Sequence, residues 1–107
     1  MSTAPHSEIL EIAALAHYQP GAIVSRQVIK GSGGNITLFA FDEGQELSEH
    51  ITPFDALAHV LDGEVEIKIS GKVFLLKAGE AIIMPANEPH AVQAVKKFKM
   101  LLTMIRV

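Results

Sequence analysis

Histidine is the residue type in this chain whose placement could do chemistry, and three histidines lie in patterned surroundings. His50 and His59 fall within the stretch from Gly44 to Gly63, and His90 follows in a second glycine-anchored stretch. Imidazole nitrogens bind first-row transition metals, and three or more protein ligands make a stable centre. The question is therefore whether enough ligands lie close together to hold a metal, and what the site does if they do not.

Composition removes several other chemistries. The chain has 107 residues, which suits one domain, and 49% of them are hydrophobic, as expected of a folded globular protein. It contains no cysteine, which excludes disulfides, thiolate metal sites and cysteine nucleophiles.

Charge and hydropathy limit the partners. The formal net charge is −3, and the one basic cluster (Lys96, Lys97, Lys99) is too short for a phosphate-binding surface, so we expect no nucleic-acid partner. The N-terminus lacks the basic start and apolar run of a signal peptide. No stretch approaches the roughly 18 apolar residues of a membrane span. We therefore expect a cytoplasmic protein without a membrane partner.

The elements that must position the histidines begin after an N-terminal segment, residues 1–22. Ser7 is a candidate N-cap for a short helix over residues 8–16, whose apolar residues fall at helical spacing. The run from Tyr18 to Gly21 ends this helix, because a proline disfavours helix in the residue before it.

Residues 23–107 are predicted to form a single all-β barrel domain. Val65, Ile67 and Ile69 alternate with polar residues, which indicates a strand with one face in the core. Short runs of this kind, separated by glycine turns, are typical of an antiparallel sandwich or barrel. Eight strands are predicted, over residues 22–30, 35–41, 55–61, 64–70, 72–77, 80–85, 90–95 and 98–107.

The last predicted strand differs from the others, because residues 100–105 are apolar on both faces. A domain this small cannot easily bury both faces alone. We expect a homodimer that covers the outer face. The alternative is that the N-terminal helix covers it.

Two motifs in this chain resemble those of the cupins. In the first, Gly44, His50 and Gly63 match, while Thr52 and Ala56 stand where a second histidine and a glutamate belong. In the second, the matching residues are Gly79, Pro85 and His90, while Asn87 and Ala94 replace a glycine and an asparagine.

The resemblance covers about residues 35 to 106. It implies a double-stranded β-helix, the cupin jelly-roll barrel, preceded here by the short helix. It also implies one divalent transition metal (iron, manganese, nickel, zinc or copper) held by three histidines and a glutamate. The family includes oxygenases, isomerases, decarboxylases and sugar-binding regulators, so the fold does not fix the function.

This chain keeps two of those ligands, His50 and His90, and two imidazoles alone bind a metal weakly. Asp55 would supply a third ligand if the turn at Pro53 shifted the register, and His59 is the other candidate. Strand alternation places both on the opposite face from Ala56. The two motif histidines could instead be polar residues of a half-buried pocket, hydrogen-bonded to Thr52 or water.

The lost ligands also suggest a use for the site. If the barrel phase holds, four residues share the inner face with His50 and line a wider, less polar cavity: Thr52, Ala56, Ala58 and Val60. Such cavities are typical of small-molecule sites. We therefore expect a pocket for a small molecule with at most a weak, incomplete metal site. The alternative is a metal-dependent oxygenase or isomerase acting on a small organic substrate.

Overall fold

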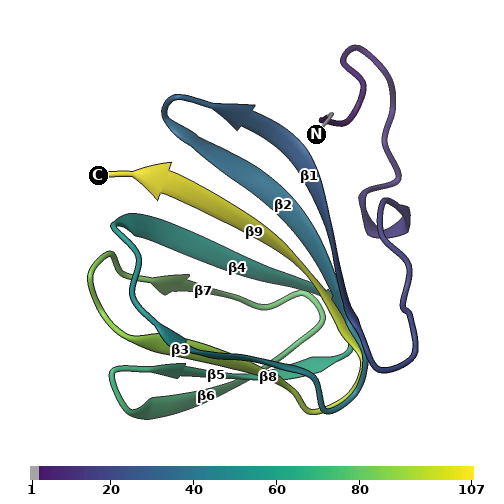
Figure 1. The fold of residues 1–107 in the computed structure, drawn as a ribbon. Helices are drawn as coiled ribbons and strands as arrows, with labels where there is room; N and C mark the ends of the chain where they lie inside the picture. The colour runs from purple at the N-terminus through teal and green to yellow at the C-terminus, as the bar shows by residue number, and fades with distance from the viewer. Residues whose placement is uncertain (1–2) are drawn as a thin grey trace.

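The structure is a computed structural model that describes residues 3–107, and within them the chain forms two antiparallel β-sheets (Figure 1). The larger sheet has the strand order β1 (Ile23–Gly31), β2 (Gly34–Phe41), β9 (Phe98–Arg106), β4 (Phe54–Asp62), β7 (Ala81–Met84). The smaller sheet has the order β3 (Glu46–His50), β8 (His90–Ala94), β5 (Glu64–Ile69), β6 (Lys72–Lys77). The predicted all-β fold is confirmed, and β3 is a strand that the sequence pattern did not predict.

The two sheets face each other and share one apolar core. Phe41, Val60 and Phe98 reach it from the larger sheet, and Val65 and Ile67 from the smaller one. All five are fully buried. The period-two alternation predicted for β5 is present, since Val65 and Ile67 are buried while Glu64, Glu66 and Lys68 are not.

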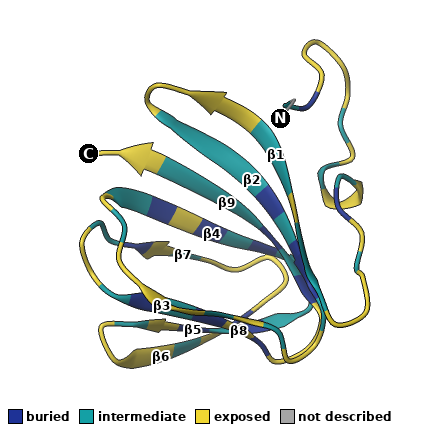
Figure 2. Ribbon diagram, viewed as in Figure 1, coloured by how far each residue is buried: buried dark blue, intermediate teal, exposed yellow. Residues whose placement is uncertain are grey.

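The sheets converge on one side and spread apart on the other. Figure 2 shows the buried positions of β2 toward the convergent side, where the aromatic rings of Phe41 and Phe98 lie 4.6 Å apart between centroids. Gly63 makes this convergence possible, because a Cβ at its position would lie 1.9 Å from the carbonyl oxygen of Lys97. Its φ of 78° also favours glycine.

The predicted N-terminal helix is wrong: the segment contains only a 3₁₀ turn, η1 (Ile12–Ala14). Ser7 has a φ of 59°, which is incompatible with the extended backbone of an N-cap, and Glu11 gives η1 no side-chain cap. A helix of two turns is marginal without such support.

The segment is held instead by contacts with the outer face of the larger sheet. Ala16 packs against Leu38 and Ala40 of β2. Tyr18 donates a hydrogen bond of 2.6 Å to Asp62, and burial together with this carboxylate raises the pKa of Tyr18. Within residues 3–107, no helix is long and apolar enough to cross a membrane.

Candidate functional site

The structure brings the two motif histidines together. His50 ends β3 and His90 begins β8, and they are direct partners across this antiparallel pair. Their ring centroids lie 4.3 Å apart, with the planes inclined at 65°. His90 is 5% exposed, whereas His50 is exposed to solvent. The pair therefore has one buried and one accessible imidazole.

Main-chain carbonyls orient both rings. The Nδ1 of His50 lies 2.8 Å from the carbonyl oxygen of Ser48, and the Nδ1 of His90 lies 3.3 Å from that of Glu88. A carbonyl oxygen only accepts hydrogen bonds, so each Nδ1 carries the proton in the neutral ring. This leaves the lone pair of each Nε2 available to a ligand.

Burial favours the neutral form of His90. It lowers the pKa of this imidazole, and the neighbouring His50 lowers it further, while the Glu88 carbonyl acts in the opposite direction. A neutral imidazole accepts a hydrogen bond through its unprotonated nitrogen and donates one through the other. The buried member of the pair is thus tuned to act as an acceptor toward a ligand.

The strand that carries His50 gives a weak signal in the sequence. In β3 only Leu47 packs against the core, and its other four residues are exposed. The pairing with β8 also shifts register between Leu47 and His50. A bulge of this kind breaks the alternation by which a strand is recognised.

Neither proposed third ligand joins the histidines. Asp55 accepts a hydrogen bond of 2.8 Å from the backbone N–H of Ala86. His59 lies between Ala58 and Val60, whose side chains are in the core, so alternation directs it to the outer face. In the described part of the chain, no three histidine, cysteine, aspartate or glutamate side chains are arranged to hold a metal.

Of the four residues expected to line a cavity, three lie in the core and one lies in a loop. Ala56, Ala58 and Val60 do face inward, but they are packed in the core and 0–2% exposed, so they leave no open cavity at their positions. The small alanines are accommodated because Met84, on the neighbouring strand β7, is buried beside them. Thr52 lies in the loop after β3, where its Oγ1 is 3.4 Å from the backbone nitrogen of Phe54.

Other inward-facing positions of the larger sheet, on the side of the molecule where β3 ends at His50, were missed in the sequence (Figure 1). Phe39 packs against the core, so alternation along β2 directs Thr37 and Asn35 to the same face. Five side chains on this face are only half-buried, and with the histidine pair they form what we call the open end: Gln27, Asn35, Thr37, Leu102 and Met104. The alternation of residues 35–41 could have located two of them.

Comparison with known proteins identifies the family of this chain. The Cupin domain family matches residues 37–106, well over half of the chain. The chain is a cupin. A conserved protein of unknown function from Streptococcus pyogenes is 33% identical, with a TM-score of 0.91, and the match covers 100% of this cupin and 96% of that chain.

Two further solved structures resemble this cupin. A cupin superfamily protein from Desulfitobacterium hafniense is 25% identical with a TM-score of 0.91, over 99% of this chain and 97% of that one. A Cupin 2 conserved barrel domain protein from Leptotrichia buccalis is 40% identical with a TM-score of 0.88, over 91% of this chain but 47% of that chain. No match was found among proteins of curated function.

The departures of this cupin from the motifs have different structural consequences. Asn87 occupies a glycine position with a φ of 65°, a conformation that asparagine tolerates better than most residues. Its backbone N–H donates a hydrogen bond of 2.8 Å to the Thr52 carbonyl, which ties together the two loops beside the histidines. Thr52 and Ala56, by contrast, remove ligands. The donor set of two imidazoles does not fit a three- or four-ligand metal centre.

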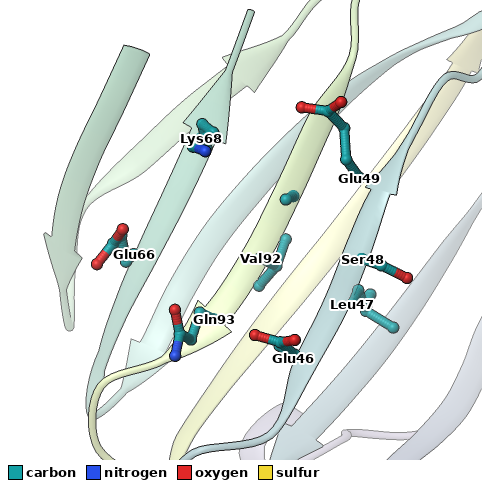
Figure 3. Close-up of a pocket in the computed structure, with 9 residues that line it drawn as sticks. Glu46, Leu47, Ser48, Glu49, Glu66, Lys68, Val92 and Gln93 are labelled. Carbon is teal, nitrogen blue, oxygen red and sulfur yellow. The ribbon is translucent and has the colours of Figure 1, made fainter. Parts of the chain in front are cut away.

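A separate hollow lies on the outer face of the smaller sheet. It has a volume of about 310 Å³, and Figure 3 shows its polar rim over β3, β8 and β5. Glu46, Glu49 and Glu66 contribute carboxylates, with Lys68 and Gln93 nearby. Its β5 residues, Glu66 and Lys68, alternate with the core residue Ile67, so this hollow opens on the face opposite the core.

Proposed function

We propose that this cupin binds a small molecule at the open end, with the His50–His90 pair as its recognition element and a metal held there weakly if at all. The observation that carries the proposal is the shared orientation of the pair. Each Nδ1 is bonded to a main-chain carbonyl, which leaves both Nε2 atoms for a ligand.

The surroundings of the pair support a ligand with polar and apolar parts. The open end offers two side-chain amides and a hydroxyl from Gln27, Asn35 and Thr37. It also offers the apolar side chains of Leu102 and Met104, which pack at the edge of the core. Apolar walls with a few convergent polar groups are characteristic of small-molecule sites.

A panel of small carboxylic acids, phenols and monosaccharides, screened by two-dimensional NMR, tests this proposal. Compounds that bind should shift the signals of Asn35, Thr37 and the histidine pair. His50→Ala should weaken their binding about tenfold, the effect of losing one hydrogen bond worth about 1.4 kcal/mol. His17→Ala is the matched control, because His17 is an exposed histidine of the N-terminal segment.

Two results would contradict the proposal. One is binding whose signals change only around Glu66 and Lys68 on the opposite face. The other is about one iron, manganese, nickel, zinc or copper per chain in protein purified without a tag or chelator. The second result would favour a metal-dependent oxygenase or isomerase, with a third ligand that forms only when the metal binds.

A further inference from the structure

The larger sheet places an arginine at the rim of the open end. Arg106 follows Met104 by two residues on β9, and Met104 packs against the core, so alternation directs the Arg106 side chain to the same inward face. Its partner across the strand pair, Phe54, shares this face with Ala56. The guanidinium carbon of Arg106 lies 5.5 Å from the centre of the Phe54 ring. The end of β9 therefore carries an exposed cation beside the histidine site.

Two contacts hold this guanidinium in place and leave part of it without a partner. Its Nε–H donates a hydrogen bond of 3.0 Å to the carbonyl oxygen of Ser32, in the turn between β1 and β2. The Phe54 ring lies beside it on the other neighbouring strand, β4. Among the described residues, Nη1 and Nη2 have no hydrogen-bond partner, and the one ion pair joins Lys96 to Glu64. The edge formed by Nη1 and Nη2 matches the two oxygens of a carboxylate.

The carboxylates of the described strands lie on the opposite side of the sheets. Strand alternation, the hollow on the smaller sheet and the bond from Tyr18 place six of them outward: Glu46, Glu49, Asp55, Asp62, Glu64 and Glu66. Glu88, in the loop before His90, accepts a hydrogen bond of 2.8 Å from the Ser70 hydroxyl. None of these carboxylates forms an ion pair with Arg106, so its charge remains unbalanced.

Two lysines add to the positive charge around the opening. Lys30 is the strand partner of Asn35, and Lys72 is the strand partner of Ile69. Directly opposed residues share a face, so both lysines take the inward face at the tips of their hairpins. A cleft lined by charge of one sign raises the local concentration of small ions of the other sign. The open end is therefore suited to an anion.

We propose that the ligand of the open end is a hydroxy acid, with its carboxylate on Arg106 and its hydroxyl on the His50–His90 pair. This inference rests on the proposed function and names the class of ligand. The Nε2 lone pairs of neutral histidines accept hydrogen bonds, and a carboxylate has none to donate. The carboxylate therefore fits Arg106, whereas a hydroxyl group, which donates, fits the imidazoles.

The two recognition groups lie close enough for one small molecule. The loop of residues 51–53 joins His50, at the end of β3, to Phe54, at the start of β4, and the C-terminal end of β9 lies on the same side of the molecule (Figure 1). Four residues span at most about 14 Å between Cα atoms. Because the side chains of His50 and Arg106 both face the space between the sheets, a ligand the size of one substituted ring can contact both.

The first test compares acids with amides of the same shape, which keep the ring and the hydroxyl but carry no charge. In NMR titrations, 4-hydroxybenzoate and 4-hydroxyphenylacetate should bind at least about tenfold more tightly than the corresponding amides. Arg106→Gln should weaken binding of the acids about tenfold and leave binding of the amides unchanged. Arg26→Gln is the matched control, because Arg26 is paired with Leu38 on the outer face, and it should bind the acids like wild type.

A second measurement uses the wild-type protein, so it holds even if Arg106→Gln fails to fold. The chain contains two arginines, Arg26 and Arg106, and its spectrum therefore contains two arginine Nε–H signals, which the Arg26→Gln variant assigns. The acids should shift the signal of Arg106 and leave that of Arg26 in place. The amides should shift neither signal.

Three outcomes would overturn the inference. Acids and amides that bind the histidine pair equally well, without a shift at Arg106, would leave the proposed function intact but remove the anion from it. Acids that perturb neither Arg106 nor the histidine pair would also overturn it, and the wider panel of compounds would then decide the proposed function separately. Tighter binding of phenyl phosphate than of 4-hydroxybenzoate, lost in Arg106→Gln, would replace the carboxylate with a phosphate.

Discussion

The barrel has an open end, described above, and a closed end, where the two sheets converge. The same strands contribute inward-facing side chains to both ends, but these side chains are apolar and buried at the closed end and partly polar and half-buried at the open end. At the closed end, Phe41, Val60, Val65 and Phe98 are fully buried. At the open end, the equivalent positions further along β2 are Thr37 and Asn35, which are half-buried and polar. The difference shows how one sandwich can place its stability at one end and its recognition chemistry at the other.

The distance between the sheets explains why the side chains at the two ends can differ in polarity and burial. The sheets converge where the bulky rings of Phe41 and Phe98 fill the space between them (Figure 1). Toward the histidines the sheets spread apart, and polar side chains there can reach water or a ligand without the cost of burial. Substitutions at the closed end should therefore change stability, and substitutions at the open end should mainly change binding.

The largest effect is expected from Phe98→Ala at the closed end. Removing this buried ring leaves a cavity beside Phe41 and should lower the free energy of unfolding by about 4 kcal/mol, measured by urea denaturation. The matched substitution on the same face of β9 is Leu102→Ala, at the open end. Because Leu102 is half-buried, its loss should cost about 1 kcal/mol. Equal decreases in the free energy of unfolding for the two variants would contradict the proposed difference between the ends.

The next largest loss of stability is expected at Gly63, which we compare with Gly44. Both glycines have a positive φ, but only Gly63 has neighbours close to the position of an added Cβ. Gly63→Ala at the closed end should cost about 3 kcal/mol, because backbone strain adds to a clash with the Lys97 carbonyl. Gly44, before β3, has a φ of 82° with nothing within 4 Å of an added Cβ. Gly44→Ala should therefore cost only the strain, about 1 kcal/mol. Urea unfolding of both variants sharpens the comparison, and a smaller loss for Gly63→Ala would refute the steric argument.

The smallest effect is a pH dependence at the open end. Burial holds the pKa of folded His90 below its ordinary value of 6.5, so the unfolded chain binds this proton more readily. The contribution to stability is present above pH 6.5 and is lost as the pH falls toward the folded pKa. Urea unfolding at about pH 7.5 and about pH 5 should show a smaller loss in His90→Gln than in wild type. His17→Ala should keep the wild-type loss, and an unchanged loss in His90→Gln would contradict the assignment.

Much of the fold could be predicted from the sequence, because alternation and turn glycines are local signals. Eight of the strands, the inward phase of Ala56 and Ala58, and the family resemblance carried by His50 and His90 all follow from spacing. The N-terminal helix could not be judged in this way. The apolar residues of this segment fit a helix, but contacts with Leu38 and Ala40 stabilise an irregular path instead.

What the sequence determined by itself is the set of available groups: two motif histidines, no cysteine, and alanine and threonine where ligands would stand. What only the tertiary structure decided is which of these groups meet. It pairs His50 with His90 across a bulged strand, turns Asp55 toward Ala86, and closes the core over Ala56. The physical reason is that alternation fixes the face on which a side chain lies, whereas bulges and the packing of distant strands fix the distances between side chains.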